Sequence, residues 1–121
     1  MINDENRASL LASSKFRSRF KLDQKDHDYI KRIGIAKIRE HTVDFIEKRL
    51  APAEPPNDGQ QTPFKGHPAF KAQHATATCC RGCLLKWYGI AKGRVLTGEE
   101  ISKVVDIIMQ WILEKQGNSK P

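Results

Sequence analysis

The apolar residues of this chain recur at helical spacing over two long stretches, and no stretch alternates regularly enough to predict a strand. In residues 35–50 one stripe contains Ile35, Ile38, Thr42, Phe45, Ile46 and Leu50. In residues 97–115 a wider stripe contains Ile101, Val104, Val105, Ile108, Trp111 and Ile112. Each pattern predicts an amphipathic helix with one buried face. We therefore expect these two helices to form the core.

Capping residues indicate where these helices, and one that precedes them, begin and end. The carboxylate of Asp23 can accept hydrogen bonds from the free amides of a first turn, which predicts a helix from there to Gly34. Gly34 either ends that helix or is tolerated inside one long helix, and we favour two helices broken near it. Thr97 and Glu100 have the spacing of a capping box at the start of the last helix.

Two shorter helices are expected in the centre of the chain. Pro68 suits the first position of a short helix that runs through His74. Thr76 or Thr78 is expected to cap a second one, which begins at the cysteines and stops at Gly89. The cysteine side chains should then lie in its first turn.

The remaining segments carry weaker signals. Residues 7–20 predict a short helix or two turns whose basic residues form either a solvated face or a phosphate-contacting arm. Residues 51–61 contain three prolines and an Asn-Asp-Gly turn signal, which predicts a loop that is either a linker or packed beside the cysteines. Residues 1–6 and 117–121 are polar and expected to be disordered. The chain 1–121 is thus predicted to be one all-α domain of four or five helices.

Composition narrows the class of protein. The 121-residue chain has 39% hydrophobic and 29% charged residues, and it has no apolar run of the ~20 residues that a bilayer span needs. These values are typical of soluble proteins rather than of disordered or membrane proteins. Acidic residues stand where a signal peptide would have its basic region. A cytoplasmic location is therefore the expected default.

Residues 62–96 concentrate the unusual chemistry. This segment contains all three cysteines, Cys79, Cys80 and Cys83, together with six basic residues and no acidic residue. In a reducing cytosol, an odd set of three close cysteines is typical of metal-binding, catalytic or redox sites rather than of a disulfide framework. This Cys/His-rich segment is therefore the candidate site.

The string GHPAFKAQHATATCCRGCLLKW in this segment resembles the central motif of a small family of bacterial and phage proteins known only as a domain of unknown function. The resemblance extends over residues 14–112. No activity is assigned to that family. The resemblance thus supports the domain boundaries and the choice of site, and it implies no mechanism.

Metal binding is the leading hypothesis for the site. Cys80 and Cys83 have the spacing of a zinc knuckle, and Cys79, His74 and His67 offer further ligands. Cys80, Cys83 and both histidines would form a closed structural site, whereas three ligands and a water would form a catalytic one. Three cysteines and a histidine also suit an iron–sulfur cluster. Without a metal, the cysteines would be small buried hydrophobes and the histidines would bind loop carbonyls.

An enzyme that uses a thiolate is the competing hypothesis. A helix N-terminus and the neighbouring Arg81 favour the thiolate form of Cys80 or Cys83, and His74 would be the base. The two cysteines can equally close a reversible disulfide. The chemistry would then be hydrolytic or redox.

The charge of the segment suggests a partner. Lysine and arginine neutralise phosphates while aromatic rings stack on bases, so a basic segment with interleaved aromatics predicts a surface for nucleic acid or another polyanion. The expected contact residues are Lys65, Lys71, Arg81, Lys86, Tyr88, Lys92 and Arg94. The sequence therefore predicts a small cytoplasmic zinc module that contacts nucleic acid, and it does not specify the oligomeric state.

Overall fold

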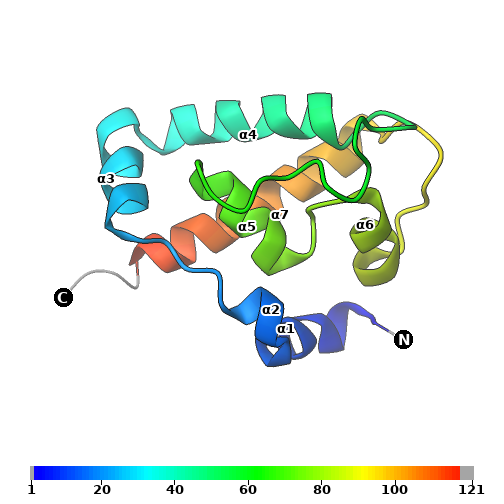
Figure 1. Cartoon of the computed structure of the whole chain (residues 1–121), viewed down its shortest axis with the longest axis horizontal. Helices are drawn as coiled ribbons and strands as arrows, with labels where there is room; N and C mark the ends of the chain where they lie inside the picture. Colours follow the sequence, from blue (N-terminus) through cyan, green and yellow to red (C-terminus); the bar gives the residue numbers. More distant parts are fainter. Residues whose placement is uncertain (1, 118–121) are drawn as a thin grey trace.

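The computed structural model describes residues 2–117, which form helices joined by turns and loops (Figure 1). These residues contain seven helices: α1 (Asp4–Ser13), α2 (Lys15–Ser18), α3 (Gln24–Ile33), α4 (Ile35–Arg49), α5 (Pro68–Thr76), α6 (Arg81–Tyr88) and α7 (Gly98–Gly117). The described part of the chain contains no strand, which confirms the all-α prediction. The number exceeds the expected four or five because the N-terminal stretch, for which a short helix or two turns were expected, forms two helices.

The core lies between α4, α5 and α7. Figure 1 shows α4 running across the top of the molecule with α5 and α7 beneath it, and both α4 and α5 pack against α7. The two predicted apolar stripes meet there, with Ile38, Ile46, Val104, Ile108 and Ile112 each 0% exposed. Burying one such side chain stabilises the fold by roughly 1.5 to 3 kcal/mol. The two amphipathic helices are thus the main source of stability, as the pattern predicts.

The predicted helix boundaries at Asp23, Gly34 and Thr97 are present. Asp23 accepts from the amide of Asp26 at 3.0 Å, and the Asp26 carboxylate accepts from the Asp23 amide at 2.9 Å. Gly34 has a φ of +87° and separates α3 from α4, a backbone conformation that an L side chain would strain. Thr97 and Glu100 form the expected reciprocal capping box.

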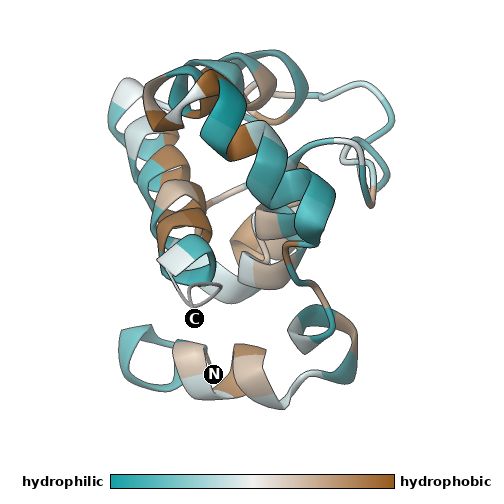
Figure 2. Ribbon diagram, turned by 90° about the vertical axis from the view of Figure 1, so that its left-hand side faces the viewer, coloured by the Kyte–Doolittle hydropathy of each residue, from teal (hydrophilic) through white to brown (hydrophobic). Residues whose placement is uncertain are grey.

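The N-terminal helices α1 and α2 form a separate layer beneath the other helices in both ribbon views (Figures 1 and 2). α1 begins at Asp4, and Asn3 and Asn6 form its capping box. Residues 3–6 therefore belong to an ordered helix start, although their polar composition led us to expect disorder. Ser14 is extended and divides α1 from α2, and its hydroxyl accepts from the Arg17 amide at 3.1 Å.

One side chain ties α1 to the rest of the fold. The Nε atom of Arg7 donates to the carbonyl of Trp87 at 2.8 Å. The same guanidinium lies 4.3 Å from the centre of the Tyr88 ring. A planar cation can hold both contacts at once because its donors lie in the plane while its face stacks on the ring. α1 is thereby fixed to the end of α6.

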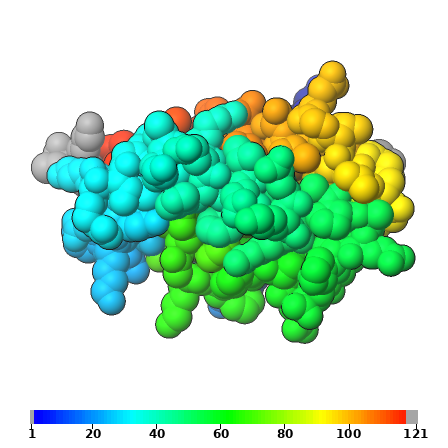
Figure 3. Space-filling model, turned by 90° about the horizontal axis from the view of Figure 1, so that it is seen from above, coloured from blue at the N-terminus to red at the C-terminus, as the bar shows by residue number. Residues whose placement is uncertain are grey.

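The loops after α4 and α6 are held together by the fully buried Arg81. Its guanidinium donates to the carbonyls of residues 50, 51 and 52 at 2.8 to 3.4 Å, and to those of residues 91 and 94 at 2.8 Å. The proline-rich stretch 51–61 therefore starts as an ordered loop packed against the domain. Viewed from above, α3, α4 and these loops make up much of the surface (Figure 3).

Length and hydropathy bear on membrane association. Among the helices of residues 2–117, none combines the length and the apolar character that crossing a lipid bilayer requires. The expected disorder of residues 118–121 concerns positions outside the described residues. Gly117, which we also expected in the tail, is the last residue of α7.

Candidate metal centre

Three cysteine sulfurs converge at the turn between α5 and α6. The Sγ of Cys83 lies 3.2 Å from that of Cys80 and 3.7 Å from that of Cys79. All three sulfurs lie within 4.8 Å of one another, and they are the one such group of metal-ligating atoms among the described residues. The cluster can therefore hold a metal ion, as the spacing of the cysteines predicts.

The turn that presents the sulfurs is built from residues 76–80. α5 ends at Ala77, which adopts a left-handed conformation with a φ of +60°. The hydroxyls of Thr76 and Thr78 lie 3.0 Å apart, and the Gln73 side chain donates to the carbonyl of Thr78 at 2.9 Å. Thr62 donates to the carbonyl of Cys79 at 2.8 Å. These bonds satisfy buried backbone groups and fix the direction in which the cysteines leave α5.

The cap of α6 differs from the prediction. Cys80 rather than Thr76 or Thr78 is the N-cap, and its Sγ accepts from the amide of Cys83 at 3.3 Å. The two threonines instead bond within the preceding turn. As the N-cap, Cys80 places its sulfur at the start of α6, where the positive end of the helix dipole favours a thiolate. Only Cys83 lies within the first turn.

Arg17, a residue that the sequence analysis did not assign to the site, bonds to two of the sulfurs. Its guanidinium donates to the Sγ of Cys83 at 3.1 Å and approaches that of Cys79 at 3.7 Å. It also donates to the carbonyl of His74 at 2.6 Å. α2 therefore places a permanent positive charge against the cluster from a distant part of the chain. The basic run around residues 15–21 was the sole hint of it in the sequence.

The thiols of Cys79 and Cys83 differ in acidity. The pKa of Cys83 is lowered far below its ordinary value because the thiols of Cys79 and Cys80 donate hydrogen bonds to its thiolate, and the charge of Arg17 adds to the effect. The pKa of Cys79 is raised because its thiol is the donor to the neighbouring sulfurs and is buried. The cluster thus favours the thiolate form of Cys83 over that of Cys79, and a bound cation would favour the thiolate form of its ligands.

His74 lies beside the cluster but outside the group of sulfurs. Its Nε2 donates to the carbonyls of Thr62 and Pro63, each at 3.1 Å. Its Nδ1 is buried and has no hydrogen-bond partner. Burial lowers the pKa of His74 below its ordinary value, and the two carbonyls oppose that shift. Its ring is therefore neutral near pH 7, with an unused acceptor nitrogen.

His67, the other predicted ligand, lies at the opposite end of α5 and does not join the sulfurs. It is the N-cap of that helix, and its Nδ1 accepts from the amide of Ala69 at 3.0 Å. Its Nε2 lies 3.1 Å from the Nδ1 of His41. Both nitrogens have partners, and burial together with His41 lowers the pKa of His67 to about 4. The structure therefore does not bring His67 together with the cysteines.

The expected basic surface is largely dispersed by the fold. Arg81 is fully buried, and the hydroxyl of Tyr88 donates to the carbonyl of Thr76 at 2.6 Å. Lys71 pairs with Asp23 and Asp26. Three further expected contacts remain on the surface: Lys92 pairs with Asp58, Arg94 pairs with Glu100, and Lys86 lies near the ring of Trp87. Of the seven expected contacts, only Lys65 is exposed with neither an ion pair nor a ring contact among the described residues.

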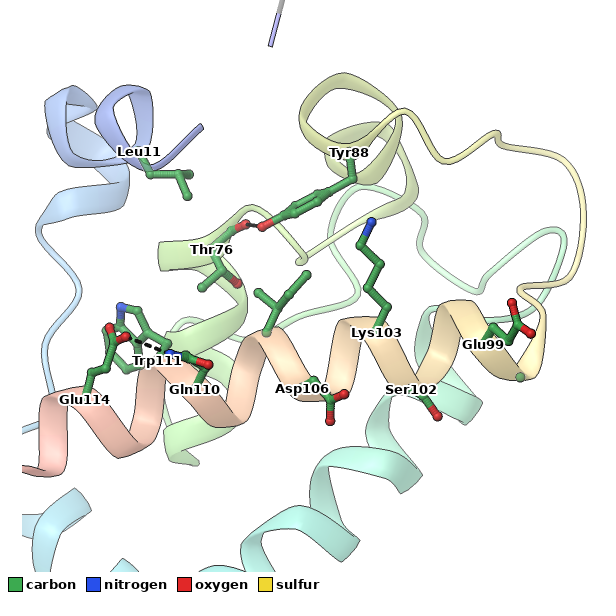
Figure 4. A pocket seen from close by; sticks show the side chains of 12 residues that line it. Leu11, Thr76, Tyr88, Glu99, Ser102, Lys103, Asp106, Gln110, Trp111 and Glu114 are labelled. Carbon is green, nitrogen blue, oxygen red and sulfur yellow. Dashed lines mark hydrogen bonds between the residues drawn. The ribbon is translucent and has the colours of Figure 1, made fainter. Parts of the chain in front are cut away.

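A cavity of about 800 Å³ lies between α1, α6 and α7, away from the cysteines (Figure 4). Lys103 extends from α7 toward Tyr88, while Leu11 of α1 and Trp111 of α7 lie nearer the other end. Acidic side chains on α7 also line it: Glu99, Asp106 and Glu114. No cysteine contributes to the lining, so this cavity is separate from the sulfur cluster.

The donor atoms fit a single soft or borderline metal ion. Tetrahedral bonds of about 2.3 Å to zinc place sulfur ligands roughly 3.8 Å apart. The Cys79–Cys83 separation of 3.7 Å lies close to that value, and the Cys80–Cys83 separation of 3.2 Å is shorter. The orphaned Nδ1 of His74 is a donor of the kind that zinc takes. In a [4Fe–4S] cluster each cysteine binds a different iron, so close sulfurs suit that type of cluster less well.

Comparisons with known proteins give a family but no activity. The sequence pattern of the family described as Domain of unknown function (DUF4186) matches residues 5–113. No solved structure matches the chain. The match agrees with the resemblance to an uncharacterised family, while the bacterial or phage origin stays a prediction.

Proposed function

We propose that this chain, which belongs to the family described as Domain of unknown function (DUF4186), is a metal-binding protein. It holds one zinc ion through Cys79, Cys80 and Cys83. The observation that carries the proposal is the mutual approach of the three sulfurs, which all lie within 4.8 Å of one another. Zinc bound to three thiolates carries one net negative charge, which Arg17 is placed to offset. The bound ion would join the end of α5 to the start of α6.

The fourth ligand is proposed to be His74 through its Nδ1. That atom is buried and lacks any hydrogen-bond partner, whereas Nε2 is occupied by two carbonyls. Because His74 lies outside the group of sulfurs, the ring or the turn must shift when the ion binds. Such a site would be closed and structural, with metal binding contributing to folding.

The first test is the metal content of protein purified without a histidine tag. We expect about one equivalent of zinc by inductively coupled plasma mass spectrometry. Cys83→Ser should lose the zinc. It should also unfold at a lower temperature, because the binding free energy of the metal no longer contributes to folding while the core is unchanged. Iron and inorganic sulfide that co-purify with the protein would show that the site holds an iron–sulfur cluster instead of zinc. Metal-free protein of unchanged stability, with no uptake of zinc on reconstitution, would refute metal binding.

The role of His74 is tested separately with cobalt. Cobalt substituted for zinc gives absorption bands that depend on the donor set, so His74→Ala should shift these bands and weaken metal affinity. His27→Ala is the matched control, since the Nδ1 of His27 is also buried without a partner but belongs to α3, away from the cysteines. Identical spectra for His74→Ala and the unaltered protein would show that a solvent molecule, not His74, completes the site.

A second candidate function is redox chemistry by Cys80 and Cys83 in the metal-free protein. It is favoured by the 3.2 Å separation of their sulfurs and by the Arg17 contact that supports a Cys83 thiolate. A hydroperoxide would oxidise that thiolate to a sulfenic acid and leave as an alcohol or water. The Cys80 thiol would then displace water and form the disulfide, so that two electrons pass to the peroxide. A hydrolytic role with His74 as base has less support, since among the described residues no hydrogen bond joins His74 to a sulfur.

Alkylation kinetics distinguish the two candidates. If Cys83 is a reactive thiolate, iodoacetamide should modify it well below the pH of ~8.5 at which a free thiol ionises, and peroxide should yield a Cys80–Cys83 disulfide by mass spectrometry. If the cysteines hold a metal, they should resist alkylation until a chelator is added. Native protein that resists both reagents after the metal is removed would refute the redox candidate.

A further inference from the structure

Three phenylalanine rings gather on the surface next to the sulfur cluster. The side chain of Phe64 is 58% exposed and that of Phe16 is 39% exposed, while Phe20 is half-buried. The ring centre of Phe16 lies 5.3 Å from that of Phe20 and 6.2 Å from that of Phe64. Two of the rings come from α2 and its C-terminal end, and the third comes from the loop before α5. We call this set the phenylalanine patch.

The patch is held in place from below by His74. The His74 ring stacks on Phe64 with centres 4.7 Å apart, and on Phe20 with centres 5.2 Å apart. The hydrogen bonds from its Nε2 fix the backbone at Thr62 and Pro63, immediately before Phe64. The exposed rings are therefore ordered before any partner arrives, which reduces the entropy lost on binding.

Positive charge surrounds these rings without acidic neighbours in the sequence. Residues 13–22 and 59–78 contain no aspartate or glutamate. The Arg19 guanidinium lies 4.8 Å from the centre of the Phe16 ring and 5.3 Å from that of Phe20. Within residues 2–117 no ion pair involves Arg19 or the exposed lysines next to the rings, which are Lys15, Lys21 and Lys65. Their charges are thus available to an anionic partner.

From this arrangement we infer that the phenylalanine patch is a binding surface for single-stranded nucleic acid. Exposed rings offer faces on which unpaired bases stack, and the surrounding cations neutralise the phosphates that link those bases. A duplex hides the faces of its bases and would use the cations alone. An acidic peptide would likewise use the charges and leave the rings in water. The surface lies beside the sulfurs and does not include them, although His74, which supports it, is also the proposed fourth ligand.

The test is fluorescence anisotropy with a labelled oligothymidine of about 20 nucleotides and a duplex of equal length, titrated at several salt concentrations. The single strand should bind more tightly than the duplex. Phe64→Ala should weaken its binding about 5- to 150-fold, the range of one lost stacking contact. Val95→Ala is the matched control because Val95 is 63% exposed and lies outside the patch, and it should leave the affinity unchanged.

The charges are tested by the salt dependence. Lys65→Ala should reduce the slope of log K against log salt by about 0.7 on the single strand. Lys103→Ala removes another exposed lysine, which belongs to α7, and should not change the slope. Absence of binding at low salt would overturn the inference. So would equal affinity for duplex and single strand with no effect of Phe64→Ala, or equal competition by polyglutamate, since each would indicate a purely electrostatic surface. Circular dichroism verifies that each variant is folded.

Discussion

The two ends of α5 carry a histidine each, and the comparison shows what separates a structural histidine from a candidate ligand. At the N-terminal end both nitrogens of His67 have partners, one on the helix and one on His41. At the C-terminal end His74 has one nitrogen on carbonyls and one buried nitrogen with none. Composition and spacing suggested the same role for both. The unmet hydrogen bond distinguishes them, because a buried polar atom without a partner is unfavourable unless a ligand supplies one.

Removal of the proposed metal should have the largest effect, and it should affect the turn from α5 into α6 but not the N-terminal end of α5. A chelator is expected to lower the unfolding free energy by about 3 to 5 kcal/mol, less than in a zinc finger because α4, α5 and α7 form a core without the ion. Hydrogen exchange should accelerate at the amides of Cys83 and Leu84, which bond to Cys80. The amides of Ala69 and Phe70 at the other end should stay protected. Uniform loss of protection along α5 would contradict this division.

Acid should weaken the His67 end first. The pKa of His67 is about 4 in the fold against an ordinary 6.5, so between these values the unfolded chain binds more protons. Stability should therefore fall as the pH is lowered from 6.5 to 4, by at most about 3 kcal/mol. His74, whose pKa is also lowered, adds in the same direction. Glu100, whose pKa Arg94 lowers to about 2, acts only below its ordinary value of 4.5.

Urea unfolding at several pH values measures this dependence. In His67→Asn the pH dependence should shrink to the part that His74 supplies, because asparagine does not titrate. Nuclear magnetic resonance of the His67 ring gives its pKa directly. A value near 6.5 would contradict the prediction and would mean that the pair with His41 opens to solvent.

Replacing the cap itself should have a moderate effect. His67→Ala removes the acceptor for the Ala69 amide and the ring that contacts Phe45 at 5.0 Å between centres. We expect a loss of about 2 kcal/mol at pH 7, of which the cap accounts for ~1 kcal/mol. His67→Asn keeps an acceptor and should lose less. Neither variant should change the metal content. A loss of metal in either variant would indicate that His67 and the cysteines contribute to the same site.

The smallest effect is expected for a substitution of Tyr29, which contacts the pair formed by His41 and His67. Its hydroxyl lies 3.4 Å from the Nδ1 of His41, which is a long contact. The Nε2 of His67 lies closer to the same Nδ1 atom, at 3.1 Å. Tyr29→Phe should therefore change the unfolding free energy by about 0.5 kcal/mol or less. A loss well above 1 kcal/mol would show that the hydroxyl, and not His67, is the principal partner of His41.

Much of the fold follows from local rules that the sequence displays. The capping boxes at Asp23 and Thr97, the break at Gly34 and the stop at Gly89 each depend on residues within a few positions, and all are present. Ser14 was harder to recognise as a helix boundary. In the sequence serine is merely a weak helix former, and its role as a cap depends on the hydrogen bond that its hydroxyl accepts from the Arg17 amide. The asparagine capping box at residues 3–6 was missed because a polar terminus was taken to be disordered.

The candidate site was predictable only in part. The three cysteines lie within five positions of one another, so any turn brings their sulfurs together. Arg17 reaches them from a position more than 60 residues earlier, a contact that depends on how α2 packs and not on any local pattern. The same limit applies to the basic segment. Counting charges could not show that Arg81 is buried and that Lys71, Lys92 and Arg94 have carboxylate partners.

The position of Arg81 between the cysteines restricts how far this site can be transplanted. Its guanidinium needs carbonyls from two separate loops, and lysine, with three donors on a single nitrogen, cannot replace that fork. A five-residue Cys-Cys-Arg-Gly-Cys insert in a foreign scaffold would therefore bury a cation without acceptors. Only a host that also supplies the loops after α4 and α6 would present the sulfurs in the same geometry. The motif is portable as a domain but not as a peptide.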